Sequence, residues 1–268
     1  MENFPARAPR LIASDIDGTL LDRNHRVPRR NRDAVVRAVQ QGAYFALSTG
    51  RPFRWIAPVL EQLPVRPVCV TSNGAVLYDS AEDRVMSAHE LSPAALAEVV
   101  DVAQTVLGTV GFGAERAGGS LGDAVEDLFV VERHYSENAL FEGFGVVSMG
   151  ELVGQPAVKF LIRNTDYSAP KLYELIAPHI DPELAHLTYS MQEGILEVAA
   201  PNVTKRRGVE WLAEHTGVAQ QETIAFGDMP NDIEMLRWAG CGVAMENAHP
   251  EVKAAADAVT VANHQAGV

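Results

Sequence analysis

Acidic side chains follow two apolar runs of the sequence. Asp15 and Asp17 come directly after the run at 11–14, and Asp228 and Asp232 come after a second run late in the chain. Residues two apart in an extended segment point the same way, so Asp15 and Asp17 could act on one group of substrate atoms. One carboxylate would then attack as a nucleophile while the other transfers protons. Carboxylates that converge from two strands also favour a hard cation such as Mg²⁺.

Two further apolar runs end in polar loops that contain glycine. Thr49-Gly50-Arg51 follows one of them, and Ser72-Asn73-Gly74 follows the other. Gly18, in the first acidic loop, lets the chain turn away without a Cβ in the path of a ligand. Ligands of parallel sheets bind outside the carboxyl ends of the strands, so we expect all four loops to surround one site.

The segments that must position these loops alternate between strand and helix patterns. Gly42 ends the first expected helix, and Gly217 follows a later one. This alternation is typical of a right-handed parallel α/β sheet. The expected strands are 11–16, 44–48, 68–71, 223–226 and 242–245, and the expected helices are 31–41, 205–215, 232–239 and 250–256.

The middle of the chain departs from this alternation. It predicts a hairpin over 75–88, a helix that starts at Ser92-Pro93, and a loop or irregular strand over the glycine-rich stretch 109–123. Further strand candidates are 128–131, 158–162, 187–190 and 195–199, with a helix over 169–179. We therefore expect one α/β core, residues 1–85 and 200–268, split by an α+β module at 86–199.

Each loop also has a purely structural interpretation. Asn73-Gly74 is a common turn, Asp232 suits a helix N-cap, Lys205 suits a helix start, and Arg51 suits the protein surface. A functional interpretation is favoured because these residues occur together in one chain and all the loops lie at strand ends.

Residues 15–20, Asp-Ile-Asp-Gly-Thr-Leu, resemble the first motif of the haloacid dehalogenase (HAD) superfamily of phosphotransferases. Thr49 resembles the Thr/Ser of the second motif, Lys205 the lysine of the third, and residues 227–232 the fourth, Gly-Asp-x-x-Asn-Asp. The Thr-Gly-Arg and Ser-Asn-Gly-Ala segments and the large insert are similar to the Cof-type subfamily, which has a class IIB cap. The resemblance implies a Rossmann-like parallel-sheet core with an inserted α+β cap domain that determines substrate specificity.

The third motif departs from the subfamily pattern. That pattern usually has Lys-Gly, whereas Arg206, Arg207 and Gly208 follow Lys205 here. Lys205 opens the expected helix and is preferred, but either arginine could share its role.

The resemblance also implies roles for the site residues. Asp15 would form an aspartyl-phosphate, and Asp17 would protonate the leaving oxygen and then activate water. Thr49 and Lys205 would hold the phosphoryl oxygens. The expected substrate-binding residues are Gly18, Gly50, Arg51 and Asn73. Mg²⁺ would be held by the Asp15 carboxylate, the Asp17 backbone carbonyl and Asp228, with Asn231 and Asp232 in or behind that shell.

Composition limits the class of partner. The chain has 268 residues, 22 Lys+Arg against 35 Asp+Glu, and a net charge of −13, which argues against a nucleic-acid or anionic-membrane partner. No apolar run approaches the roughly 20 residues of a membrane span, and residues 1–10 lack the apolar stretch of a signal peptide. Cys69 and Cys241 are too few for a disulfide framework. We expect a cytoplasmic monomer or homodimer.

The leading hypothesis is a Mg²⁺-dependent phosphatase of small phosphorylated metabolites such as sugar phosphates or flavin mononucleotide, with the module as a mobile cap. A phosphomutase would use the same site but return the phosphoryl group to a second hydroxyl. A receiver-like regulatory domain would also use an acid pair, a threonine and a lysine, but the length, the cap and Asp17 disfavour it. A non-enzymatic binder would fit a chain that lacks Asp15 or Asp17, and both are present.

Overall fold

The computed structural model describes residues 8–140 and 142–268, which form two compact units. One unit joins residues 8–86 to Thr204–Val268, and the other is formed by residues 87–140 and 142–203. The boundaries between the units lie at 86/87 and 203/204. The sequence analysis expected them at 85/86 and 199/200. The N-terminal stretch tested above for a signal peptide lies mostly outside the described residues.

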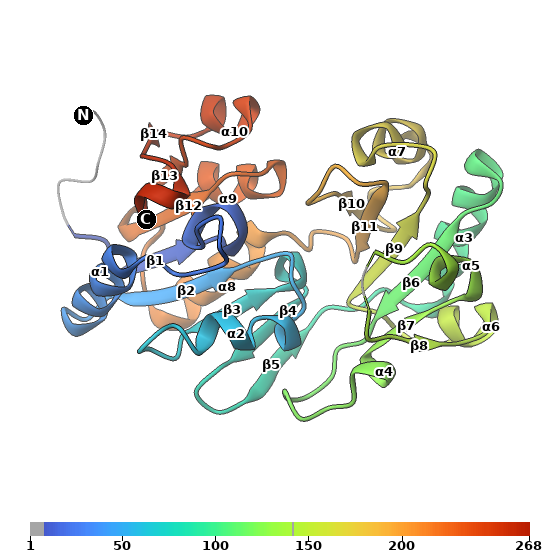
Figure 1. Ribbon diagram of the computed structural model, residues 1–268, viewed down its shortest axis with the longest axis horizontal. Coiled ribbons are helices and arrows are strands. Elements are labelled where there is room, and N and C mark those ends of the chain that lie inside the picture. Colours follow the sequence, from blue (N-terminus) through green and yellow to red (C-terminus); the bar gives the residue numbers. More distant parts are fainter. Residues whose placement is uncertain (1–7, 141) are drawn as a thin grey trace. The chain divides into compact units, whose positions relative to one another are not determined.

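Within the described residues, the first unit is built on an eight-stranded sheet in the order β14-β13-β12-β1-β2-β3-β4-β5 (Figure 1). The strands from β14 to β3 pair in parallel, and β4 runs antiparallel to β3. The order places β1 between β12 and β2, so the direction of winding reverses at β1. Ligands of open α/β sheets bind at such a switch point. The strands are β1 (Leu11–Ser14), β2 (Tyr44–Ser48), β3 (Val68–Thr71), β4 (Val76–Asp79), β5 (Arg84–Ala88), β12 (Thr223–Gly227), β13 (Cys241–Ala244) and β14 (Ala258–Val259).

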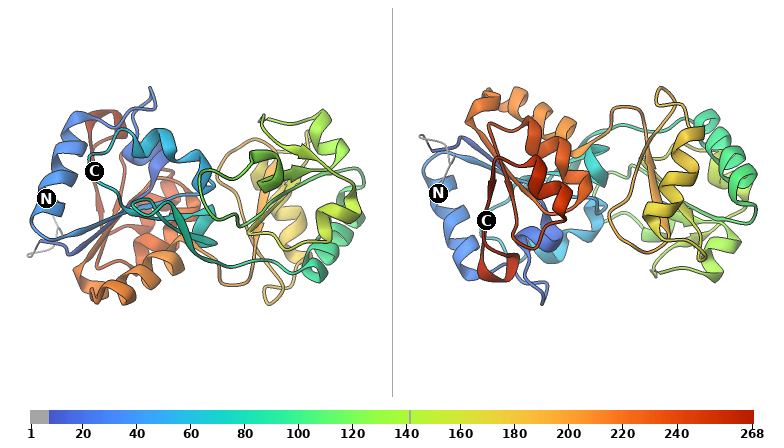
Figure 2. Two further views of the ribbon diagram at one scale, coloured as in Figure 1. Left: turned by 90° about the horizontal axis from the view of Figure 1, so that it is seen from below. Right: turned by 90° about the horizontal axis from the view of Figure 1, so that it is seen from above.

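Helices cover both faces of this sheet. Apolar side chains of α8 and α9, such as Leu212 and Met235, pack with Leu11, Ala46 and Val70 in one buried cluster. Helix α1 lies on the opposite face (Figure 2). Strands that are covered on both faces have no polar face, which explains their continuous apolar runs. The helices of this unit are α1 (Arg29–Gln40), α2 (Ala57–Leu60), α8 (Lys205–Thr216), α9 (Ile233–Trp238) and α10 (Pro250–Ala255).

The second unit has a six-stranded sheet in its described part, in the order β10-β11-β9-β6-β7-β8. Its pairs are antiparallel except for β7 with β8. A large apolar cluster on one face joins the strands to α3, α6 and α7. The elements are α3 (Pro93–Leu107), β6 (Gly111–Glu115), α4 (Val125–Leu128), β7 (Phe129–Val131), α5 (Arg133–Glu137), β8 (Gly145–Val146), α6 (Met149–Val153), β9 (Lys159–Arg163), α7 (Ala169–Ile176), β10 (His186–Thr188) and β11 (Ile195–Ala199).

Strand β6 corrects one sequence-based expectation. The glycine-rich stretch 109–123 was expected to be loop or irregular strand. Residues 116–123 are loop, but Gly111–Glu115 is a regular strand between β9 and β7. A Cβ on Gly111 would lie 2.8 Å from the Cα of Tyr135 in α5. The glycine is therefore explained by the close approach of a neighbouring helix and not by a turn.

Both cysteines are free, in keeping with their small number, and both are buried. In the portion of the chain that the structure describes, no helix combines the length and the apolar character that a membrane span needs.

Candidate active site

Asp15 lies at the carboxyl end of β1, directly before a π-helical turn over Ile16–Leu20. The N–H of Leu20 donates to the carbonyl oxygen of Asp15 at 3.3 Å, and Gly18 has a φ of +77°. The turn separates the two carboxylates that an extended chain would have aligned. The Asp15 side chain is 7% exposed and points into the unit, whereas the Asp17 side chain is 49% exposed.

Lys205 connects Asp15 to the loop after β12. Its Nζ donates to Oδ1 of Asp15 and to Oδ1 of Asp232, each at 2.7 Å, and the lysine side chain is 2% exposed. Carboxylate oxygens of Asp15, Asp228 and Asp232 lie within 4.8 Å of one another. The fold therefore gathers three buried carboxylates and one ammonium from three distant parts of the chain.

The charges of this cluster do not balance. Burial raises the pKa of Asp15 well above its ordinary value; the ammonium of Lys205 opposes this shift, and Asp232 and Asp228 reinforce it. Burial, with the charge of Asp232, raises the pKa of Asp228 to about 7. Burial disfavours the charged form of Lys205, but the carboxylates of Asp15 and Asp232 outweigh it and raise the pKa of the lysine. One cation among three carboxylates leaves an excess of negative charge that a divalent ion would offset.

The carboxylate oxygens of this cluster fit Mg²⁺, but the three aspartates differ in how many of their oxygens already accept hydrogen bonds. Both oxygens of Asp232 already accept hydrogen bonds: Oδ1 accepts from Lys205 at 2.7 Å, and Oδ2 accepts the N–H groups of Asp228 and Met229, both at 3.0 Å. Oδ2 of Asp15 has no hydrogen bond within the described residues, and Asp228 accepts the hydroxyl of Thr19 on Oδ1 at 3.0 Å. Asp15 and Asp228 therefore offer hard oxygen ligands, while Asp232 orients them. Sequence reasoning assigned no role to Thr19, although it stands inside the first motif.

Asn73 connects the loops that follow β2, β3 and β12. Its N–H donates to the carbonyl of Thr49 at 3.0 Å, and its Oδ1 accepts from Nδ2 of Asn231 at 3.0 Å. Oδ1 also lies 3.1 Å from the point where a Cβ on Gly50 would be. The Oδ1 of Asn231 is buried without a hydrogen-bond partner in the described structure, so it is an acceptor that a bound ligand could satisfy.

The turn over Ser72–Gly74 packs against the start of α8. Its three residues have φ angles of +49°, +56° and +100°, a conformation that costs energy for residues other than glycine. A Cβ on Gly74 would overlap the carbonyl oxygen of Thr204, the residue before Lys205. The turn therefore helps to fix the position of the buried lysine.

We expect Gly74→Ala to lower the free energy of unfolding by about 3 kcal/mol or more, since it adds both backbone strain and a clash with backbone. Gly42→Ala is the matched control, because Gly42 also has a positive φ, +92°, but no atom within 4 Å of its Cβ position. That control should cost only the strain, about 1–2 kcal/mol. Urea unfolding of both variants measures the difference. Equal losses would contradict the packing argument.

Asp17 and Arg51 pair with each other and stay outside the carboxylate cluster. Nε of Arg51 donates to Oδ2 of Asp17 at 2.7 Å, and an NH2 nitrogen donates to Oδ1 in a shorter contact. Arg206 and Arg207 do not share the place of Lys205, because both pair with Glu210 on α8, at 3.2 Å and 2.5 Å. Of the three basic residues that open the helix, Lys205 alone reaches Asp15 within the described structure.

Asn247 supports the turn after β1, and no sequence motif marked it. Its Nδ2 donates to the carbonyl of Gly18 at 2.8 Å, and its Oδ1 accepts the N–H of Asn263 at 2.9 Å. Asn263 in turn donates to the carbonyl of Leu21 at 2.8 Å. The bonds to Gly18 and Leu21 connect residues more than 200 positions apart, which local patterns do not reveal.

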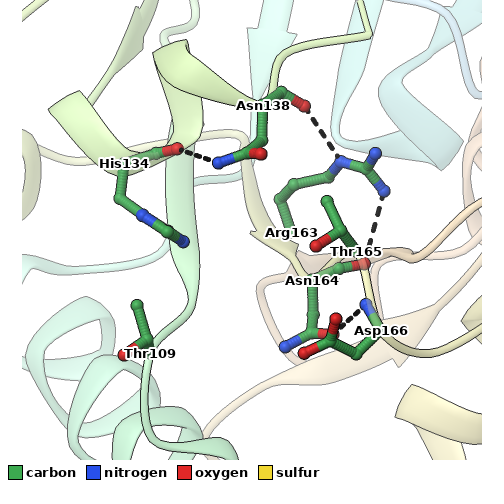
Figure 3. A pocket seen from close by; sticks show the side chains of 7 residues that line it. All are labelled: Thr109, His134, Asn138, Arg163, Asn164, Thr165 and Asp166. Carbon is green, nitrogen blue, oxygen red and sulfur yellow. Dashed lines mark hydrogen bonds between the residues drawn. The ribbon is translucent and has the colours of Figure 1, made fainter.

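A separate pocket of about 150 Å³ lies in the second unit (Figure 3). It is lined by Thr109, His134, Asn138, Arg163, Asn164, Thr165 and Asp166. Much of its polar wall is bonded internally: Arg163 donates to the carbonyls of Asn138 and Asn164, and Asn138 donates to that of His134. None of the site residues expected from sequence lines this pocket, so the candidate active site is the carboxylate cluster at the strand ends.

Comparisons with known proteins agree with this geometry. The family model of haloacid dehalogenase-like hydrolases matches residues 12–268. The 5-amino-6-(5-phospho-D-ribitylamino)uracil phosphatase YitU of Bacillus subtilis is 27% identical, and the alignment covers 97% of this chain and 95% of the relative. The HMP-PP phosphatase of Serratia proteamaculans is 30% identical over 95% and 90% of the two chains. The solved HAD phosphatase BT1666 from Bacteroides thetaiotaomicron superposes with a TM-score of 0.80 at 20% identity, covering all of this chain and 95% of its own.

A doubly wound core with an inserted α+β unit and a buried carboxylate–lysine cluster defines an enzyme of the HAD class. The chain belongs to the haloacid dehalogenase-like hydrolases. The resemblance and the fold class expected from sequence are thereby confirmed.

Proposed function

We propose that this protein is a Mg²⁺-dependent phosphatase that hydrolyses small phosphorylated metabolites through an aspartyl-phosphate on Asp15. The observation that carries the proposal is the buried cluster of Asp15, Lys205, Asp228 and Asp232 at the switch point of the sheet. Membership in a hydrolase family, with relatives named as phosphatases, supports an enzyme over a receiver-like regulatory domain.

The proposed reaction uses Asp15 twice, as nucleophile and then as leaving group. A carboxylate oxygen of Asp15 attacks phosphorus, and the ester oxygen leaves with a proton from Asp17. Asp17 then takes a proton from water, which attacks the aspartyl-phosphate, releases inorganic phosphate and restores Asp15. Lys205 and Thr49, with the backbone N–H of Gly50, are proposed to hold the phosphoryl oxygens during both transfers.

Asp15 and Asp228 would hold the Mg²⁺ ion through carboxylate oxygens, with the backbone carbonyl of Asp17 as a further proposed ligand. When bound, the ion offsets the charge of the phosphoryl group that approaches a carboxylate nucleophile. The three hydrogen bonds that Asp232 accepts keep Lys205 and the loop after β12 in place for this arrangement.

We propose that the second unit, expected at 86–199, is the cap that selects the leaving group and excludes water. Relatives named for a phosphoribitylamino-uracil and for HMP-PP suggest a small heterocyclic or sugar phosphate as the substrate class. The test is phosphate release from a panel of sugar phosphates, nucleotides, flavin mononucleotide and heterocyclic phosphates, with Mg²⁺ and with chelator. Transfer of the phosphoryl group to a second hydroxyl, with no release, would indicate a phosphomutase instead.

Mg²⁺ is expected to stabilise the protein most strongly above pH 7. The pKa of Asp228 is raised from 3.8 to about 7, so between these values the folded protein holds a proton that the unfolded chain has released. The free energy of unfolding of the metal-free protein therefore falls as the pH rises from about 4 to about 7, and it stays low above that range. The raised pKa of Asp15 acts in the same direction. Mg²⁺ binds the charged carboxylates, so at high pH its binding restores the free energy of unfolding that the metal-free protein has lost.

Thermal unfolding with Mg²⁺ and with chelator measures the effect. We expect Mg²⁺ to raise Tm by about 5 °C or more at pH 8 and by less than about 2 °C at pH 5. Asp228→Asn is the control, and it should lose the difference at pH 8. An equal shift at both pH values would contradict the proposed ligand set.

A further inference from the structure

Two cations stand near the candidate nucleophile in the described structure, and they are held very differently. Lys205 is 2% exposed and shared between two buried carboxylates, so its ammonium has no room to leave. Arg51 is 24% exposed, and its one carboxylate partner, Asp17, is 49% exposed. Water can replace the partner of each group in this pair, so the pair opens at a lower cost than the buried pairs of Lys205.

The backbone of Arg51 is held by two hydrogen bonds that do not involve Asp17. Its N–H donates to Oγ1 of Thr49 at 3.1 Å, and its carbonyl accepts the N–H of Ser72 at 2.9 Å. Beyond the bonds to Asp17, the guanidinium makes one long contact, from NH1 to the carbonyl of Trp55 at 3.4 Å. The long side chain therefore extends from a backbone that is held beside Thr49, the residue proposed to hold a phosphoryl oxygen.

The pair with Arg51 occupies both oxygens of the Asp17 carboxylate. A guanidinium keeps its protons and holds this carboxylate in a two-pronged contact. Opening the pair frees both groups for other partners. A phosphoryl dianion bears more charge than a carboxylate and accepts the same two-pronged contact, so it competes for the guanidinium.

We propose that Arg51 is a counter-ion switch: it holds Asp17 in the free enzyme and exchanges to the phosphoryl group of the incoming substrate, which releases Asp17. The inference rests on the proposed function for the role of Asp17 and adds a positioning role for Arg51. The ligand that operates the switch is a dianionic phosphoryl group.

The test is a double-mutant cycle on the binding of inorganic phosphate, measured by calorimetry in the presence of Mg²⁺. R51Q should weaken binding about 10-fold or more, because a charge-assisted contact is lost. D17N should strengthen binding several-fold, because Asp17 no longer competes for Arg51. In the R51Q background, D17N should strengthen it by a smaller factor, since simple charge repulsion then remains without the competition. R51K, which keeps the charge without the planar fork, should fall between R51Q and the wild type.

The control is R10Q, which removes an exposed arginine–carboxylate pair, Arg10 with Glu222 at 3.1 Å, at the opposite end of β1. It should leave phosphate affinity unchanged. Unchanged affinity in R51Q, or equal effects of D17N in both backgrounds, would overturn the switch.

Kinetics with two esters supply a second readout. An alkyl phosphate needs a proton on its leaving group, whereas p-nitrophenyl phosphate does not. R51Q should raise KM for both esters and leave the ratio of their kcat values unchanged. D17N should lower kcat for the alkyl ester far more than kcat for p-nitrophenyl phosphate. If R51Q depressed the alkyl ester selectively, Arg51 would be a fixed support of Asp17 and the switch would be wrong. If the wild type bound phosphate but hydrolysed neither ester, the proposed function would fail, and the binding cycle would still test the switch.

Discussion

Asp15→Asn is expected to lower phosphate release by about a thousandfold or more. The substitution keeps the shape of the side chain and leaves an oxygen that can accept from Lys205, but an amide oxygen cannot form the proposed phosphoenzyme. Steady-state phosphate release with the best substrate of the panel measures the loss. Mass spectrometry of rapidly quenched wild-type enzyme should find the phosphoryl group on the peptide that contains Asp15.

The same substitution should raise the free energy of unfolding of the metal-free protein at pH 8. The raised pKa of Asp15 means that its charged form is disfavoured in the folded state, so a neutral replacement relieves the cluster. Asp33→Asn is the matched control, since Asp33 lies on α1 in an exposed pair with Arg29 at 3.5 Å. It should change neither activity nor stability appreciably. Retention of more than about a tenth of the activity in Asp15→Asn would show that another group is the nucleophile.

Lys205→Met is expected to lower both activity and stability. It leaves Asp15 and Asp232 buried without their shared cation, and breaking a buried pair by removing one partner costs about 3–5 kcal/mol. Urea unfolding at pH 8 with chelator measures the free energy. Activity should fall as well, because the group proposed to hold phosphoryl oxygens is lost.

Arg206→Met is the matched control for this substitution. Arg206 is the next residue of α8, but its side chain is 43% exposed and pairs with Glu210 at the surface, so the loss should stay below about 1 kcal/mol. Adding Asp232→Asn to Lys205→Met should restore part of the stability and none of the activity, because it removes one uncompensated charge. A loss in Lys205→Met no greater than that in Arg206→Met would mean that the buried pairs contribute nothing measurable.

Local patterns predicted most of the elements of the core. The apolar runs that become β1, β2, β3 and β12 are continuous because helices cover both faces of the sheet, and each ends in a polar loop. Asp15, Thr49, Lys205 and Asp228 could be selected because they recur in a recognisable order at those ends. The second unit was harder to predict, since Gly111–Glu115 looks like loop until the close approach of Tyr135 is known.

The roles of neighbouring residues depended on distant contacts. Asp15 and Asp17 are two positions apart and were expected to point the same way, but the π-turn directs one carboxylate to Lys205 and the other to Arg51. Asp232 looked like a ligand or a cap, and the structure shows both of its oxygens in use.

One physical cause separates what the sequence alone determined from what only the tertiary structure decided. Hydrophobic periodicity and turn residues act over a few positions, so the strands, the loops and the kinds of chemistry at their ends could be inferred from the chain alone. The partner of each buried charge is set by which loops the folded sheet brings together: Lys205 and Asp15 are 190 positions apart, and Asn247 and Gly18 are 229. The direction of a carboxylate and the charge it faces therefore become known only when the packed core places those loops side by side.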